Sequence, residues 1–288
     1  MLLEKIVILG KLKILSKHHT SYDVLSDHLT DKGSLITSDL LSDNEQKQNS
    51  LIEDLKKLKL YGMASDLENQ FINEDVYSRV TFFIRIEQLI NKQISYALNK
   101  KYNSLLKKSK IKDYLSFDDL KYNQQEDGIT PDEVAFLASN SWATDNIMNV
   151  IIQGATGAGK TALSSAMAIN LCKAGVTVRK YRWCDLVNDI VVRSDDPKAL
   201  IQLQTQLCKY PVLIIDDFGL QDKVPSVVKS TVYNFIDSRW KKKSTVFTSQ
   251  LNNEGIVKLI GDGPEGNAIV DRIFNPSKQI ILTGASKR

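Results

Sequence analysis

The sequence predicts an α/β protein: a domain with a central, mainly parallel sheet flanked by helices, preceded by a small all-helical domain. Three observations lead to this prediction. Short apolar runs alternate with helix-like segments from about residue 131 onward, which is the pattern of parallel strands joined by crossover helices. Residues 50–117 show helical spacing of apolar residues instead. A glycine-rich stretch separates the first apolar run from the helix-like segment after it.

The composition is that of an ordinary folded protein. Hydrophobic residues make up 42% and charged residues 25% of the 288 residues, which argues against a disordered chain. A net charge of +4 permits a polyanionic partner without requiring one. Three cysteines without C-x-x-C spacing argue against a disulfide scaffold or a zinc site. No apolar run has the length of a membrane span, so a cytoplasmic protein without a membrane partner is expected.

The N-terminal residues differ from the rest. Residues 1–48 are expected to form a leader of unassigned role that is partly flexible, because the stretch SDLLSDNEQKQNS is polar and rich in turn formers. A helix is then predicted to begin at Ser50, since Glu53 stands at the spacing of a capping box. Gly62 indicates a break after this helix.

The remaining boundaries follow from the change in pattern. Residues 49–117 are predicted to be a helical domain for DNA binding and assembly, and residues 118–288 the sheet domain, with 118–135 as a linker. Five strand-like runs are expected in the second domain: NVIIQG, VTVRKYR, PVLIIDD, STVFTSQ and KQIILTG.

The most specific motif runs from Gly154 to Thr161 and fits G-x-x-x-x-G-K-[ST]. It follows a strand-like run and opens a helix-like one, which is the context that a phosphate-binding loop requires. Glycines allow successive N–H groups to turn toward phosphate oxygens, and the helix N-terminus adds its positive end. Lys160 is expected to reach the β- and γ-phosphates of ATP, and the Thr161 hydroxyl to bind Mg²⁺. The predicted nucleotide-binding residues are Gly154, Ala155, Thr156, Gly157, Ala158, Gly159, Lys160, Thr161 and Ala162.

Two adjacent carboxylates end the run YPVLIIDDFGL. A phosphate-loop protein needs a carboxylate beside the metal at the end of a neighbouring strand, and Asp216 is predicted to hold Mg²⁺ through its water shell. Asp217 is predicted to orient the attacking water or accept its proton. Without the phosphate loop, the same pair would be interpreted as an acidic turn after a strand. Asp is one methylene shorter than Glu, so slow turnover is expected.

Two further candidates follow in the sequence. The run STVFTSQ ends in side-chain donors, of which Gln250 is the candidate to contact the γ-phosphate or position water. Arg272 lies in a helix-like segment, where it can stabilise transferred charge in a neighbouring subunit. The alternative is that Arg272 pairs with Asp271 or another surface acid.

Basic residues gather in two places. From Lys92 to Lys112 there are seven lysines and no acidic residue, which suits a sequence-independent contact with a DNA backbone. A solvated helix face is the alternative. No base-reading motif is visible, which fits low sequence specificity. The predicted DNA-binding residues are Lys100, Lys101, Lys107, Lys108 and Lys112, with Arg179, Lys180 and Arg182 from the second cluster.

In sequence order, these motifs resemble the IstB-like AAA+ ATPases, the ATP-binding helper proteins of insertion-sequence transposition, which are related to DnaC-type helicase loaders. The resemblance runs from about Leu51 to the C-terminus. It is carried by LKKLKLYGMASDLE, by the phosphate loop with Trp142 and Asn146 before it, by LIIDDFGL, by STVFTSQLN and by IGDGPEGNAIVDRIFN.

The resemblance implies a phosphate-loop AAA+ domain that uses ATP and Mg²⁺. It implies Gln250 as the sensor at the strand end and Arg272 as an arginine finger acting in trans. It also implies a homo-oligomer that assembles on double-stranded DNA with little sequence preference, stimulates a transposase and hydrolyses ATP in a DNA-stimulated reaction. The alternatives are a replicative helicase loader and an architectural protein that bound ATP locks on DNA. A phosphate-loop kinase is disfavoured because no lid or acceptor signature appears.

Overall fold

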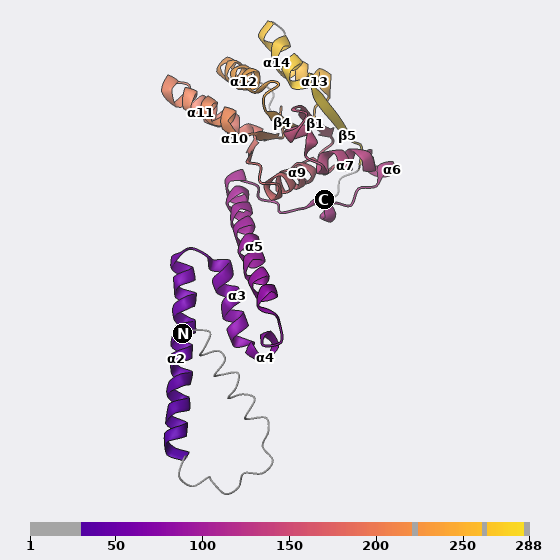
Figure 1. Cartoon of the computed structure of the whole chain (residues 1–288). Coiled ribbons are helices and arrows are strands. Elements are labelled where there is room, and N and C mark those ends of the chain that lie inside the picture. Colours follow the sequence, from indigo (N-terminus) through magenta and orange to yellow (C-terminus); the bar gives the residue numbers. More distant parts are fainter. Residues whose placement is uncertain (1–29, 221–223, 261–263, 285–288) are drawn as a thin grey trace. The chain divides into compact units, whose positions relative to one another are not determined.

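The computed structural model describes residues 30–220, 224–260 and 264–284, with only the backbone described for residues 30–42, 264 and 265 (Figure 1). Residues 1–29 of the predicted leader lie outside the described residues. The chain divides into two compact units after Ala97, within helix α5 (Phe82–Ser109). The predicted domain boundaries at 48 and 117 stay predictions. None of the described helices is both long enough and apolar enough to cross a membrane.

The first unit is entirely helical in its described residues. It contains α2 (Thr30–Lys57), α3 (Tyr61–Ile72), α4 (Glu74–Tyr77) and the first part of α5. The predicted helix start at Ser50 and the turn-rich stretch before it are wrong, because α2 continues through both. Single Ser, Asp and Asn residues cost a helix little, and Lys47 pairs with Asp43 one turn earlier, at 3.1 Å.

The predicted break lies just before Gly62. Lys59 has a left-handed φ of 62°, and Gly62 itself lies in the first turn of α3. A Cβ at Gly62 would stand 2.7 Å from the backbone of Lys92 and Gln93. The glycine therefore allows α3 and α5 to approach closely, and the Gln93 side chain accepts a hydrogen bond from its N–H at 2.8 Å.

The second unit is built on a parallel sheet of five strands in the order β2-β3-β4-β1-β5. The prediction of a parallel sheet and of its five strand-like runs is confirmed. β1 and β3 both neighbour β4, so the loops after these three strands meet at one edge of the sheet. The strands are β1 (Asn149–Gly154), β2 (Val178–Arg182), β3 (Val212–Asp216), β4 (Ser244–Ser249) and β5 (Ser277–Leu282).

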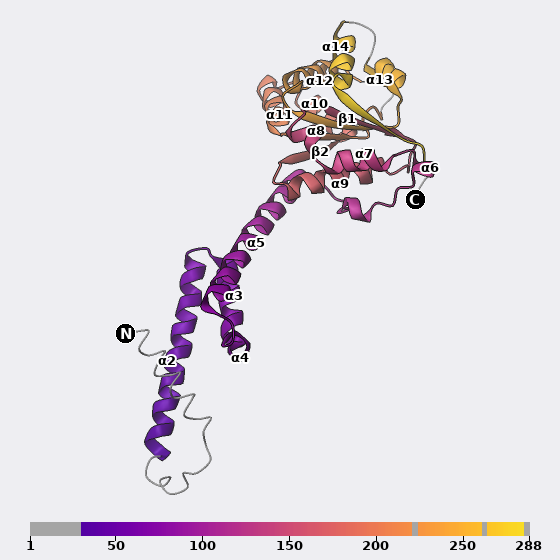
Figure 2. The ribbon, with the colours of Figure 1, turned by 45° about the vertical axis from the view of Figure 1, so that its right-hand side comes forward.

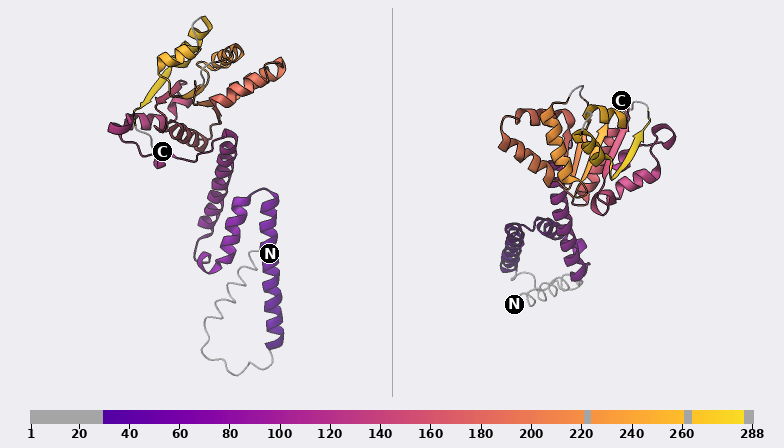
Figure 3. Two further views of the ribbon diagram at one scale, coloured as in Figure 1. Left: turned by 180° about the vertical axis from the view of Figure 1, so that it is seen from behind. Right: turned by 90° about the horizontal axis from the view of Figure 1, so that it is seen from above.

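Helices cover both faces of this sheet (Figures 2 and 3). Alternate residues of each strand face opposite layers, as in β1, where Val150 and Ile152 belong to one buried cluster and Ile151 to the other. The first layer holds α7 (Pro131–Ala138), α8 (Ser141–Thr144) and α9 (Lys160–Lys173); the second holds α10 (Trp183–Val192), α11 (Pro197–Lys209), α12 (Ser226–Arg239), α13 (Asn253–Ile260) and α14 (Pro264–Phe274).

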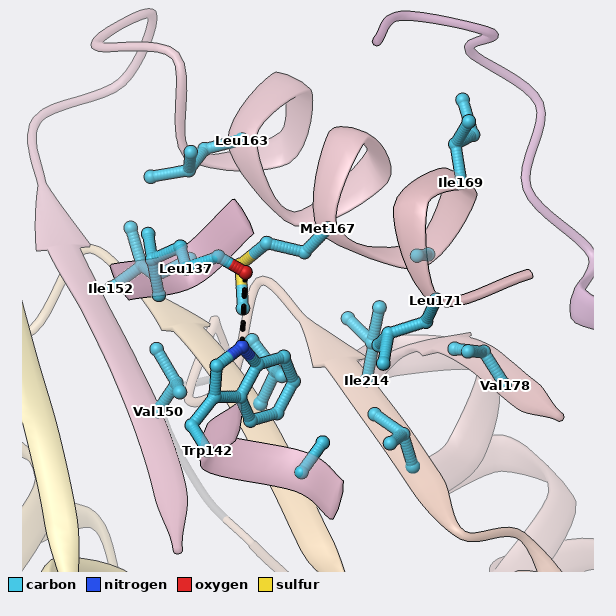
Figure 4. Close-up of a cluster of buried hydrophobic side chains, with 14 of the residues drawn as sticks. Leu137, Trp142, Val150, Ile152, Leu163, Met167, Ile169, Leu171, Val178 and Ile214 are labelled. Carbon is cyan, nitrogen blue, oxygen red and sulfur yellow. Dashed lines mark hydrogen bonds between the residues drawn. The ribbon is translucent and has the colours of Figure 1, made fainter. Parts of the chain in front are cut away.

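Trp142 organises the first layer. Its indole is fully buried beside Met167 of α9 and Val150 of β1, and its N–H donates to the Leu137 carbonyl at 3.1 Å (Figure 4). The residues predicted as a linker belong to the same layer. They include the short helices η1 (Phe117–Asp119) and α6 (Gln124–Asp127), and the buried Ile129. The N-terminus of α9 is thereby held against the sheet at the end of β1.

Candidate nucleotide-binding site

The phosphate loop joins β1 to α9 in the geometry that its sequence predicts. Gly157 and Gly159 have φ values of 86° and 94°, which glycine adopts without strain. A Cβ at Gly154 would lie 2.4 Å from the Leu282 carbonyl of β5, so only glycine fits there. Lys160, the first residue of α9, is 5% exposed, and its ammonium donates to the carbonyls of Gly154 and Ala155, each at 2.7 Å.

A cavity of about 480 Å³ opens beside this loop, within the range of small-molecule sites, roughly 300–1,000 Å³. Most of the predicted nucleotide-binding residues line it, together with Asp217 and Gln250; Gly154, Ala155 and Ala158 are not among its described lining residues. The complete lining consists of Asp113, Leu115, Thr156, Gly157, Gly159, Lys160, Thr161, Ala162, Arg182, Asp217, Leu220 and Gln250.

Asp216 ends β3 beside the phosphate loop and is almost fully buried. Its Oδ1 accepts a hydrogen bond from the Thr161 hydroxyl at 3.4 Å and another from the Thr248 hydroxyl. A hydroxyl and a carboxylate oxygen side by side form the hard oxygen donor set that Mg²⁺ prefers. The two residues predicted as metal ligands therefore fit the ion.

Asp217 follows in a strained backbone conformation, with φ of 56°. Its N–H donates to the Thr248 hydroxyl at 2.9 Å. The next residue, Phe218, donates its N–H to the Thr248 carbonyl at 2.7 Å, and its buried ring packs edge-on against Trp183, 4.7 Å between centroids. These contacts hold the Asp217 carboxylate, which is 24% exposed, at the wall of the cavity.

The end of β4 reaches the same cavity. Thr156 of the phosphate loop donates its hydroxyl hydrogen to Gln250 Oε1 at 2.9 Å. The predicted sensor is thus in direct contact with the loop. Ser249 instead donates to the Phe218 carbonyl at 2.7 Å, so the polar residues at this strand end also fix the segment after Asp217.

The basic cluster on β2 lies differently from the prediction. Lys180 was expected to contact DNA, but its ammonium is buried 3.0 Å from Asp216 Oδ2. Arg182 lines the nucleotide cavity, with its guanidinium 4.0 Å from Asp217 Oδ2. Arg179, on the opposite face of the strand, donates to the Lys108 carbonyl at 3.1 Å and lies over the Tyr181 ring. Strand alternation explains the split, since residues 180 and 182 point toward α9 and β3.

The predicted lysines of α5 and the segment after it are all exposed. The residues concerned are Lys100, Lys101, Lys107, Lys108 and Lys112. Their role in DNA binding stays a prediction.

Arg272 of α14 is held within its own chain. Its guanidinium forms an ion pair with Asp237 of α12 and lies 5.4 Å from the ring centroids of both Tyr233 and Trp240. It is not among the described residues that line the nucleotide cavity. The pairing with a surface acid, left open by the sequence, is present, with Asp237 as the partner.

Sequence reasoning missed the residues that approach the cavity from the segment before the sheet domain. Asp113 and Leu115 line the cavity, and the Tyr122 hydroxyl donates to the Gly159 carbonyl at 3.5 Å. Burial, with a smaller contribution from Asp127, raises the pKa of Tyr122, so the phenol remains a donor. No motif marks these residues, because they precede the phosphate loop by about 40 residues and only the fold brings them to it.

Comparisons with known proteins agree with this geometry. The family described as IstB-like ATP binding protein matches residues 53–288. A Pseudomonas fluorescens protein, named as an ATP-binding protein of insertion sequence IS1162, is 32% identical over 69% of this chain and 85% of its own length. A Bacillus thuringiensis subsp. berliner protein, named likewise for IS232, is 24% identical over 83% of this chain and 93% of its own.

Solved structures give the fold. The crystal structure of DnaI covers 60% of this chain and 90% of its own, at 20% identity and a TM-score of 0.48. The DnaC helicase loader covers 58% and 96%, at 17% identity and a TM-score of 0.47. The strand order, the parallel sheet and the phosphate loop are those of an AAA+ domain. On the match over residues 53–288, the chain belongs to the IstB-like ATP-binding proteins, the ATP-binding proteins of insertion sequences.

Proposed function

We propose that the chain is a Mg²⁺-dependent ATPase that assembles on double-stranded DNA and recruits or stimulates a transposase, with hydrolysis acting as a switch. The observation that carries the proposal is the meeting of the phosphate loop, the Asp216–Asp217 pair and Gln250 at one edge of the sheet. The names of its relatives, which place them in insertion sequences, support the biological setting.

Binding uses the phosphate loop and the start of α9. The N–H groups around Gly157 and Gly159 receive the phosphate oxygens. Lys160 exchanges its two carbonyl partners for the β- and γ-phosphates, which gives a neutral-to-charged gain in hydrogen-bond strength. Thr161 and Asp216 would hold Mg²⁺, which supplies charge neutralisation of the phosphates when bound.

Hydrolysis uses the residues across the cavity. Asp217 orients a water molecule toward the γ-phosphate and accepts its proton. Gln250, already bonded to the phosphate loop through Thr156, senses whether the γ-phosphate is present. The short Asp217 side chain and its neighbour Arg182 favour a low rate, which suits a timed switch rather than a motor.

The function is tested by measuring ATP turnover of the purified chain with and without double-stranded DNA, and by co-purification with candidate partners. DNA-stimulated turnover and a complex with a transposase are expected. Absence of turnover under both conditions would leave the architectural alternative, in which ATP only locks the protein on DNA. A stable complex with a hexameric helicase and none with a transposase would favour the helicase-loader alternative.

For DNA binding we propose the exposed lysines that follow Ala97. Replacing Lys101, Lys108 and Lys112 together by alanine is expected to weaken binding. The slope of log affinity against log salt should fall by up to about three, at roughly 0.9 per phosphate contact. Fluorescence anisotropy over a salt series measures this. The matched control replaces Lys47, Lys56 and Lys57, which pair with carboxylates on α2, and should leave the slope unchanged; an equal loss in both would contradict the assignment.

For Arg272 we propose a role in the ATP site of a neighbouring subunit, after release from Asp237. Arg272→Ala should bind ATP normally but lose most of its turnover on DNA. Mixing it with Asp217→Asn is expected to restore part of the activity, because each Asp217→Asn subunit offers an intact Arg272 to a neighbour with an intact Asp217. Turnover of the mixture no higher than that of the separate variants would contradict an action in trans.

A further inference from the structure

Two cations on β2 lie opposite the two carboxylates at the end of β3. The strands pair in parallel, with Lys180 beside Ile214 and Arg182 beside Asp216. From this register, Lys180 reaches Asp216 at 3.0 Å and Arg182 approaches Asp217 at 4.0 Å. The neighbouring strand therefore supplies one positive charge for each carboxylate before any metal ion is considered.

The two pairs differ in burial. The Arg182 side chain is 61% exposed, so water screens its attraction to Asp217 strongly. The side chains of Lys180 and Asp216 are 10% and 4% exposed. A buried ammonium needs polar partners in place of water, and the hydroxyls of Ser165 and Ser164 on α9 lie 3.2 and 3.5 Å from Lys180 Nζ. Lys180 is thus built into the site.

The oxygens of Asp216 are divided between two sets of partners. Oδ1 accepts from Thr161 and Thr248, on the side of the phosphate loop. Oδ2 faces Lys180. The ammonium therefore leaves the oxygen beside Thr161 in place for a metal ion, while its charge stays within a few ångströms of that position. At such distances, and away from bulk water, charges interact strongly.

We propose that Lys180 is a built-in counter-cation of Asp216 that lowers the affinity of the protein alone for Mg²⁺, so that the metal is bound together with the nucleotide. This inference rests on the proposed ATP site. With Lys180 present, the charge of Asp216 is already balanced, and a divalent ion without nucleotide adds uncompensated positive charge. ATP phosphates bring the negative charge that makes the ion favourable there.

The test is a Mg²⁺ titration of the full chain in the absence of nucleotide, followed by calorimetry and by thermal unfolding. Lys180→Met removes the charge and keeps much of the side-chain length. Its half-saturating Mg²⁺ concentration is expected to be about tenfold lower than that of the wild type, or lower still. Lys180→Gln, which can still donate to Asp216, should shift in the same direction.

The matched control is Lys278→Met. Lys278 pairs with Glu133 at the same distance, 3.0 Å, but outside the nucleotide cavity, so this variant should bind Mg²⁺ like the wild type. A Lys180 variant that is unfolded without Mg²⁺ and folds on its addition also supports the inference. An unchanged or raised Mg²⁺ requirement in both variants would overturn it, as would unfolding of both that Mg²⁺ does not reverse.

A second titration, with a fluorescent ATP analogue, separates this inference from the proposed function. Wild-type protein that fails to bind the analogue with Mg²⁺ would refute the ATP site itself. Wild-type protein that binds it, beside Lys180 variants with an unaltered Mg²⁺ dependence, would refute only the role of Lys180.

Discussion

Replacing Lys160 by alanine is expected to abolish ATP binding at any practical concentration. The ammonium is buried at the start of α9 and aimed along the phosphate loop. Hydrogen bonds to charged groups contribute roughly 1.5–3 kcal/mol each. The loss of two to the β- and γ-phosphates corresponds to a decrease in affinity of about 100-fold or more. DNA assembly should fail with it, since the proposal makes assembly depend on ATP.

Affinity for a fluorescent ATP analogue measures the effect, and thermal unfolding without nucleotide checks that the chain remains folded. Lys173→Ala, at the exposed last turn of the same helix, is the control and should bind the analogue normally. ATP binding retained by Lys160→Ala would show that the phosphate loop does not hold ATP phosphates as proposed.

Replacing Asp217 by asparagine is expected to separate binding from hydrolysis. Asparagine tolerates the left-handed φ of 56° at this position, so the fold and the ATP affinity should persist. The amide cannot accept the proton of water as a carboxylate does, and general-base catalysis contributes about 100- to 10,000-fold. Turnover on DNA should fall by about 100-fold or more, and the assembly on DNA should last longer.

Steady-state ATP turnover and the lifetime of the DNA complex measure the two effects. Asp195→Asn makes the same change at an exposed position between α10 and α11 and should leave both unchanged. Normal turnover of Asp217→Asn would exclude Asp217 as the base. A loss of ATP binding would instead assign it to nucleotide binding or to the fold.

Much of the fold could be predicted because its signals are local. The five strands and the helix after the phosphate loop each follow from apolar patterns a few residues long. Errors occurred where local preference was weak: residues 38–50 read as a turn-rich stretch and yet form part of α2. There, helix propagation and surface ion pairs outweigh the modest cost of each polar residue.

The site was predicted in part, for the same reason. The phosphate loop and the Asp216–Asp217 pair are contiguous motifs whose chemistry follows from residue type and spacing. Asp113, Leu115 and Tyr122 reach the cavity only through the path of the chain before the sheet domain. A contact between distant segments leaves no local periodicity, so one sequence does not reveal it.

The sequence by itself determined the phosphate loop, the parallel sheet and the membership of the IstB-like family, since glycine positions, strand patterns and motif order are properties of short segments. Only the tertiary structure decided which charges meet. Lys180 belonged to a basic cluster in the sequence, but strand pairing points it into the interior beside Asp216, and Arg272 lies on Asp237 of another helix. Electrostatic pairing depends on distance in space and on burial, and both are set by the packing of the whole unit.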